Sequence, residues 1–207
     1  MAIIEFVLPT FKQEAEAITA FTSTIVPFLT DLLDKSEPGT GPKQRAVGKL
    51  LLENGKDVSG DFRPCLGLEW ERAEDFYNLI ASEGFKSFGA LVKPHSLAPP
   101  NPQLYETDLG GGEVFASAMT EVWQVRIGEG NGEDARGAWR VFVDAVGCGV
   151  KGIQGLSLNQ PERLWIGVLG WESEEVREKV LRSEAVIEAK KGLDELVWNT
   201  FVASFAQ

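Results

Sequence analysis

The sequence contains one histidine, His95, and histidine is the side chain best suited to proton transfer near neutral pH. It stands in Lys93-Pro94-His95-Ser96, where a proline-rich segment begins. No nucleophile motif accompanies it. We predict His95 as a catalytic acid–base residue. The alternative, which is the commoner situation for a loop histidine, is plain solvation.

Two further polar side chains, Tyr77 and Asn78, lie about one turn into a predicted helix. Either could orient a phenol or an enolate oxygen of a substrate by hydrogen bonding. A solvated helix face is the commoner explanation for such residues. Together with His95, they form the catalytic group that the sequence predicts.

Two tryptophans, Trp70 and Trp171, end predicted strands, where an indole could stack on an aromatic ligand and donate its N–H. Gln124 and Arg126 share one face of another predicted strand and could hold a carbonyl or a carboxylate. Trp123 lies on the opposite face of that strand. These five residues are the predicted substrate-binding set. Core packing for the tryptophans, and solvent for the polar pair, are the alternatives.

No set of histidine, cysteine and carboxylate residues has metal-ligand spacing, so we predict no metal. Gly110-Gly111-Gly112 lacks the lysine and the strand–loop–helix setting of a phosphate loop, and we interpret it as a linker. We therefore predict no cofactor. Cys65 and Cys148 are typical of a reduced intracellular protein, although a disulfide between them remains open without distances.

Composition narrows the possible partners. Of the 207 residues, 43% are hydrophobic, which is enough for a sizeable core, and the net charge of −11 disfavours nucleic acid and anionic membranes. The first residues lack the basic start of a signal peptide, and Glu5 interrupts their apolar run. We see no apolar stretch long enough to span a bilayer. A cytoplasmic protein is expected.

A weak internal repeat is visible in the sequence. Trp70-Glu71 and Trp171-Glu172 are separated by 101 residues (positions 70 and 171). Continuing this alignment without gaps places Ser82-Glu83 on Ser183-Glu184. Because the matching residues are few, the stronger evidence for a repeat is the order of the predicted elements.

Hydrophobic periodicity predicts the same element order in both halves. In the first half we predict strands at 3–8, 46–53, 62–70 and 104–107, and helices at 13–34 and 73–91. The segment 46–53 could instead be partly helical. In the second half we predict strands at 121–127, 150–158, 163–170 and 196–205, and helices at 133–146 and 173–191, the last one stopped by Gly192. In the first helix, the residues expected to face inward are Ile18, Phe21, Ile25, Phe28 and Leu32.

These elements predict an α+β fold made of two fused ferredoxin-like β-α-β-β-α-β units, residues 1–109 and 113–207. Two helices would cover one face of each antiparallel sheet. The other face still carries apolar side chains, which the second unit can bury. The expected result is an intramolecular dimeric α+β barrel.

The segment Gly170-Trp171-Glu172-Ser173, followed late in its helix by Ser183-Glu184, resembles the dimeric α+β barrel superfamily, and especially its antibiotic-biosynthesis-monooxygenase-like domains. Fused tandem forms are familiar from fungi. The resemblance implies a cavity between each sheet and its helices. Such relatives oxidise polyphenols without metal or flavin, degrade haem, remove carboxyl groups, or dehydrate and cyclise polyketides.

This sequence departs from the pattern because the helix after each strand-end tryptophan has no histidine, which argues against haem. We expect a cofactor-independent enzyme of secondary metabolism, of monooxygenase or cyclase/dehydratase type. Its partner would be a hydrophobic aromatic or polyketide-like small molecule, bound in one working cavity. The alternatives are a non-catalytic small-molecule-binding or stress-related protein, and a structural remnant with filled cavities. The chain would be a monomer, or a homodimer of such chains.

Overall fold

The computed structural model describes residues 1–36, 39–128, 132–147 and 150–205. Within them, nine strands form one antiparallel sheet, and eight of these strands close into a barrel. The barrel strands of the first half are β1 (Ala2–Val7), β2 (Gln44–Glu53), β4 (Pro64–Trp70) and β5 (Gln103–Thr107). Those of the second half are β6 (Met119–Arg126), β7 (Lys151–Ser157), β8 (Leu164–Trp171) and β9 (Val197–Phe205). The short strand β3 (Lys56–Asp57) extends β2 as a hairpin.

The order around the barrel is β2-β4-β1-β5-β7-β8-β6-β9, after which β9 pairs with β2. In the first half β4 and β1 are central and β2 and β5 are outer. In the second half β8 and β6 are central and β7 and β9 are outer. The halves therefore meet along two seams, β5–β7 and β2–β9. An α+β fold with a closed antiparallel barrel is confirmed.

A glycine stands at a matching place in each seam. Gly48 on β2 is paired with Cys65, and Gly155 on β7 is paired with Ile166, which lies 101 positions after Cys65. A Cβ atom on Gly48 would lie 2.1 Å from the Ser204 carbonyl oxygen, and one on Gly155 would lie 2.3 Å from that of Glu106. Both seams thus require glycine for the strands to approach this closely.

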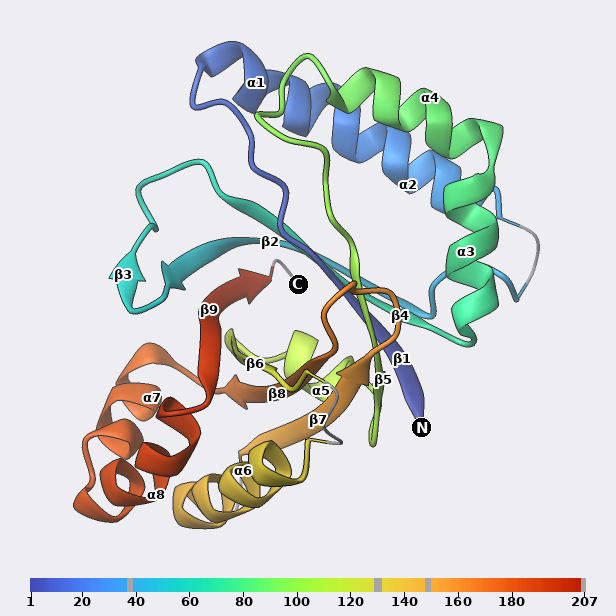
Figure 1. The fold of residues 1–207 in the computed structure, drawn as a ribbon. Coiled ribbons are helices and arrows are strands. Elements are labelled where there is room, and N and C mark those ends of the chain that lie inside the picture. Colours follow the sequence, from blue (N-terminus) through green and yellow to red (C-terminus); the bar gives the residue numbers. More distant parts are fainter. Residues whose placement is uncertain (37–38, 129–131, 148–149, 206–207) are drawn as a thin grey trace.

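The helices cover the barrel on two opposite sides (Figure 1). One side carries α1 (Ala15–Ala20), the π-helical turn η1 (Phe21–Ile25), α2 (Val26–Asp34), α3 (Ala73–Ala81) and α4 (Glu83–Val92). The other side carries α6 (Glu133–Val146), α7 (Glu174–Leu181) and α8 (Glu184–Asp194). The predicted glycine linker leads into a short helix, α5 (Gly112–Phe115), whose Phe115 packs in the barrel core.

The inward face of the first helix differs from the prediction. Phe28 and Ile18 are exposed, whereas Leu29 and Leu33 face the core. A π turn inserts one residue into the helical repeat, so the inward positions after it fall one residue later. Pro27, which lacks a backbone N–H and so cannot make a regular helical hydrogen bond, is the second residue after the π turn.

The two long helices predicted at 73–91 and 173–191 are each broken, at Ser82 and at Ser183. Both serines have extended backbone and begin a new helix. The repeated Ser-Glu pair therefore marks a helix start. The prediction that Gly192 ends the last helix was wrong, because α8 continues to Asp194. Ser173 caps the start of α7, since its hydroxyl accepts from Val176 N at 3.2 Å.

The helical stretch Ala15–Asp34 is long and apolar enough to cross a membrane by length and composition, which the sequence analysis did not expect. It lies near the N-terminus, and 22% of the tested window is buried. Its residues Phe21 and Ile25 pack against Phe11 and Val92 in a small core cluster. In this structure it is thus one of the layers over the sheet.

Cys65 is a free thiol buried in the barrel core, where desolvation raises its pKa to about 12. Such a thiol is largely unreactive because the nucleophilic thiolate is not formed near neutral pH. Cys148 lies outside the described residues, and so does the disulfide to Cys65 that the sequence left open.

Candidate functional site

A cavity of about 130 Å³ lies between the sheet and the helices of the first half. Its walls come from β1 and β4 (Val7, Leu66, Leu68), from the helices (among them Leu29, Phe76 and Phe88), and from Pro100 and Pro102. Among the described residues that line it, Glu5 alone has an ionisable side chain. The resemblance implied a cavity of this kind, and the first half has one.

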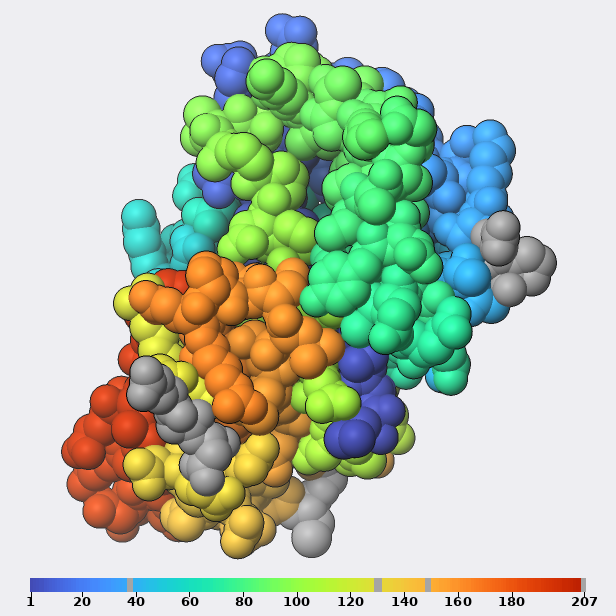
Figure 2. All heavy atoms as spheres, turned by 45° about the vertical axis from the view of Figure 1, so that its right-hand side comes forward, coloured from blue at the N-terminus to red at the C-terminus, as the bar shows by residue number. Residues whose placement is uncertain are grey.

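The proline-rich segment after α4 closes one side of this cavity. Figure 2 shows it running over this face of the molecule to the β7–β8 turn of the second half. There the side-chain amides of Asn159 and Gln160 donate to the Pro102 carbonyl oxygen at 2.8 and 3.3 Å. The second half thus holds part of the wall of the first-half cavity.

Strand β1 points Glu5 toward the cavity. Its alternation places Ile4 and Phe6 in the barrel core, so Glu5 and Val7 face the helices. The Trp70 indole N–H donates to Glu5 Oε2 at 2.8 Å, and Glu5 is only 4% exposed. Within the described part of the chain, its other oxygen, Oε1, has no hydrogen-bond partner.

Burial raises the pKa of Glu5 to about 7, and the Trp70 hydrogen bond opposes this shift in part. A carboxyl group with such a pKa exists in both protonation states near neutral pH. It can therefore either take or give a proton at the floor of an apolar cavity.

The second half repeats the tryptophan–glutamate contact. The Trp171 indole N–H donates to Glu121 Oε2 at 3.0 Å. The register is the same, because Trp70 pairs with Ile3 and Trp171 pairs with Met119, two residues before the glutamate in each case. This agreement shows that Glu5 and Glu121 occupy matching positions.

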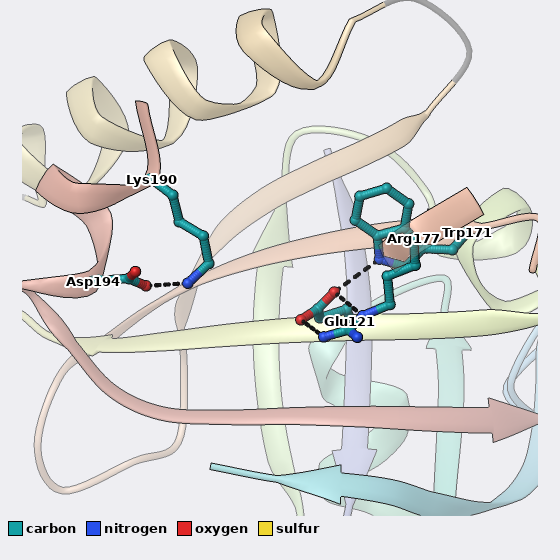
Figure 3. A network of polar contacts seen from close by, with 5 residues as sticks. All are labelled: Glu121, Trp171, Arg177, Lys190 and Asp194. Carbon is teal, nitrogen blue, oxygen red and sulfur yellow. Dashed lines mark hydrogen bonds and ion pairs between the residues drawn. The ribbon is translucent and has the colours of Figure 1, made fainter. Parts of the chain in front are cut away.

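Glu121, however, has a cationic partner. Arg177 on α7 donates from Nε to Oε2 at 2.7 Å and from a terminal nitrogen to Oε1 at 2.6 Å (Figure 3). Both carboxylate oxygens are therefore occupied. The matching residue of the first half, six positions after Trp70, is Phe76, which lies edge-on to Trp70 at a centroid distance of 6.0 Å.

Aromatic rings fill much of the space beneath the second-half helices. Trp123 occupies the position that matches Val7, and its ring lies 5.5 Å from that of Trp139 and 5.3 Å from that of Phe142, centroid to centroid. A pocket of about 350 Å³ remains beside them. It is lined by the Glu121–Arg177 ion pair and by the ion pair of Lys190 with Asp194, both drawn in Figure 3. The second pocket is thus polar where the first is apolar.

The structure places the predicted tryptophans in the core. Trp70 and Trp171 are 1% and 0% exposed, and each holds a glutamate rather than lining the first-half cavity. Trp123 lines the polar pocket and belongs to the aromatic cluster. Of the three, Trp70 is linked to the cavity, through Glu5.

Gln124 and Arg126 lie away from both pockets. Gln124 is buried in the barrel, where it donates to the Tyr105 hydroxyl at 2.7 Å and accepts from the Asn199 amide at 2.8 Å. Burial also raises the pKa of Tyr105. Arg126 is exposed, pairs with Glu162 at 2.8 Å and lies over the Trp198 ring. Neither residue is among those that line the apolar cavity.

The predicted catalytic residues are not gathered around the cavity. Tyr77 and Asn78 are exposed on α3. His95 is half-buried, and its backbone carbonyl accepts from Lys12 N at 2.9 Å. None of the three lines the cavity. Their catalytic roles therefore stay predictions.

Glu5 is not among the site residues predicted from the sequence, although the signal was present there. Glu5 is the one acid in an otherwise apolar strand, at a position where alternation demands burial against the helices. Glu121 is likewise the one acid of β6, although that strand also contains Thr120, Gln124 and Arg126. Within the described residues, no group of three or more histidine, cysteine or carboxylate side chains could hold a metal ion. The expectation of no metal stays a prediction.

No protein-family model matches the sequence, and no curated protein is significantly similar to it. Solved structures are similar in fold. A protein described as anthrone oxidase-like aligns with 100% of this chain and 92% of its own, with a TM-score of 0.65 and 13% identity.

A protein from Lactobacillus acidophilus, named provisionally as a monooxygenase, aligns over 99% of this chain and 93% of its own, with a TM-score of 0.57 and 11% identity. A mutant chlorite dismutase from Candidatus Nitrospira defluvii aligns over 99% of this chain and 91% of its own, with a TM-score of 0.58 and 10% identity. At these identities the comparisons show the fold alone. The chain has a monooxygenase-like α+β barrel fold, a type found among oxidative enzymes.

Proposed function

We propose that this protein is a cofactor-independent enzyme that acts on an aromatic or polyketide-like small molecule in the first-half cavity, and that Glu5 is its proton acceptor. One observation carries the proposal: a cavity with otherwise apolar walls contains one buried carboxyl group with a free oxygen. A buried carboxyl is costly unless its protonation or a ligand compensates for it. Groups of this kind are concentrated at functional sites.

The size of the cavity limits the buried part of the substrate. Cavities of about 150 Å³ hold a benzene-sized molecule, and this one has a volume of about 130 Å³. The cavity is therefore close to the size that holds a single aromatic ring. A polycyclic substrate would place one ring beside Glu5 and the rest outside the cavity.

A monooxygenase reaction follows from this geometry with dioxygen as co-reactant. Glu5 removes one proton from an activated CH₂ or phenolic group of the substrate. The substrate anion supplies the electrons that reduce dioxygen. For a CH₂ group, one oxygen atom stays on the carbon as a carbonyl, and the other leaves as water with the two hydrogens. The protein contributes orientation, exclusion of water and the proton acceptor. Cyclisation or dehydration would begin with the same proton removal.

We also propose that the chain consists of two fused ferredoxin-like units, residues 1–109 and 113–207, of the antibiotic-biosynthesis-monooxygenase-like type. The same strand order in both halves, the matching tryptophan–glutamate contacts and the matching seam glycines support this organisation. Several further expectations from the sequence stay predictions: a tandem fungal origin, a role in secondary metabolism and a cytoplasmic location. It also stays a prediction that the protein is a monomer or homodimer and binds neither nucleic acid nor membranes.

A non-catalytic small-molecule-binding protein is the second candidate function. It is favoured by the position of His95, Tyr77 and Asn78 outside the cavity, since a binding protein requires no reactive group beyond Glu5. Measuring whether a bound ligand is converted to product distinguishes the enzyme from the binding protein.

The test begins with calorimetric and fluorescence titrations against a panel of phenols, quinones and haem. We expect one aromatic class to bind saturably and to consume dioxygen or yield a rearranged product. Glu5→Gln should abolish turnover while the ligand still binds. Glu121→Gln is the matched control and should retain turnover. Binding without turnover for the whole panel would favour the second candidate, and binding of none would refute both.

A further inference from the structure

We propose that residue 76 determines the ligand class of the first-half cavity. With phenylalanine there, the cavity recognises a neutral aromatic molecule through a single O–H donor, a phenol or an enol, which bonds to the free oxygen of Glu5. This inference rests on the proposed function, since it takes the cavity as the ligand site. It adds the chemical group that is recognised and the residue responsible.

The argument starts from the two matching positions. From α7, Arg177 reaches the second-half glutamate and occupies both of its oxygens. From α3, Phe76 reaches the matching place in the first half but offers no donor. Glu5 therefore keeps one oxygen bonded to Trp70 and one oxygen for a ligand.

The remaining described residues around Glu5 supply no charge. The residues facing it from β4 and the helices, such as Leu68, Leu29 and Leu33, are apolar. On β5 its register partner is Leu104. Helix α3 also carries the buried Asp75, whose carboxylate is held by Arg72 at 2.7 Å. Within the described part of the chain, burial and Trp70 are the causes found for the shifted pKa of Glu5.

The number of donors decides which ligand fits. A phenol or an enol has one O–H donor, and the free oxygen of Glu5 is one acceptor, so both groups are satisfied. An alkylammonium ion has three N–H donors, and apolar walls would leave the others unpaired. A carboxylate or phosphate would bring a second negative charge close to Glu5 with no cation in the lining.

Four matched ligands test this selectivity: 4-ethylphenol, 4-ethylanisole, 4-ethylbenzylamine and 4-ethylbenzoate, each titrated by calorimetry. We expect 4-ethylphenol to bind about tenfold more tightly than 4-ethylanisole, which corresponds to about one hydrogen bond. The amine and the benzoate should bind more weakly than either. Glu5→Gln should reduce the preference for the phenol over the ether. Equal binding of phenol and ether, or strongest binding of the benzoate, would overturn the inference.

Reciprocal variants test residue 76 itself. Phe76→Arg should reduce phenol binding at least tenfold, whereas Phe76→Leu, which stays apolar, should bind within about threefold of the parent. Infrared spectroscopy adds a readout that needs no ligand, because a protonated carboxyl group has its own C=O stretching band. The parent at pH 6 should show a buried carboxylic acid band that Glu5→Gln and Phe76→Arg both remove.

If Phe76→Arg does not fold, Arg177→Met keeps the test decisive. Arg177→Met removes the cation from Glu121 and should therefore show a second carboxylic acid band. The double variant Arg177→Met, Glu121→Gln should lack this second band. A single unchanged band in Arg177→Met would overturn the role of this position. If the bands behave as expected but none of the four ligands binds, the cavity is not a ligand site, and the proposed function fails together with the ligand class.

Discussion

At the scale of single residues, the two glutamates show how one neighbour changes the state of a carboxyl group. Glu5 and Glu121 share the same strand register and the same indole donor, and both are at most 5% exposed. Arg177 compensates the charge of Glu121, while no charged group among the described residues compensates Glu5. The free energy of the fold should therefore depend on pH through Glu5.

The pH dependence of stability tests the environment of Glu5. The folded protein holds the Glu5 proton more tightly than the unfolded chain, since its pKa rises from 4.5 to about 7. Stability should consequently fall as the pH rises from about 4.5 to 7 and then level off. The total change is about 3 kcal/mol, at 1.36 kcal/mol per pKa unit. Urea unfolding of the parent and of Glu5→Gln at pH 4 to 8 measures it, and parallel curves would contradict the burial of an unpaired carboxyl.

Glu121→Gln should behave differently. The substitution leaves Arg177, whose side chain is 15% exposed, without its bidentate partner. Breaking such a pair from one side costs about 3 kcal/mol. The loss should be present at pH 7 and should shrink in Arg177→Met combined with Glu121→Gln, where no unpaired cation remains. Chemical denaturation of the three proteins gives the values, and an unchanged midpoint for Glu121→Gln would show that the ion pair contributes nothing.

At the scale of elements, the alternation of the strands was predictable, and the details of the helices were not. The face of β1 formed by Ile4 and Phe6 is in the barrel core, as the period of two predicts. The π turn covers only Phe21–Ile25, just before Pro27, and a search for the regular helical period cannot detect it. The same period carried the predicted helices across Ser82 and Ser183, because apolar residues continue on both sides of each break.

The two helix breaks provide a matched pair for a stability test. The Ser82 hydroxyl accepts from Phe85 N at 3.1 Å, whereas Ser183 makes no side-chain cap. Ser82→Ala should therefore cost about 1 kcal/mol, and Ser183→Ala should be nearly neutral. Thermal unfolding of both variants checks this. Equal losses would mean that the serines act through backbone preference rather than through the hydrogen bond.

At the scale of the whole molecule, closure of the barrel depends on two seams between the halves. The seam glycines allow backbone approaches that no Cβ atom permits. Gly48→Ala should destabilise the fold by about 2 kcal/mol or more, since the clash is with backbone atoms that cannot rotate away. Gly137→Ala is the control, because Gly137 is exposed in α6 with nothing within 4 Å, and it should be neutral or stabilising by up to about 1 kcal/mol. Guanidinium unfolding compares them, and a neutral Gly48→Ala would show that the seam can relax.

The candidate site could be predicted from the sequence only in part. The resemblance implied a cavity in each half, only one of them working, and the acid in β1 was visible in the sequence. The environment of that acid depends on Phe76, which lies 71 residues further along the chain (positions 5 and 76). His95 was predicted from its residue type, and Gln124 from the strand face that it shares with Arg126. Which of them face a common space follows from strand register and helix rotation, and these are properties of the folded chain.

The joining of both halves in one chain has an evolutionary consequence. In a barrel assembled from two identical subunits, a single codon would specify both positions, and every substitution beneath one set of helices would appear beneath the other. Here positions 76 and 177 are encoded separately, so a phenylalanine and an arginine can stand at matching places in the same molecule. One half can then change with the selection imposed by a ligand while the other conserves the interactions that keep the barrel stable.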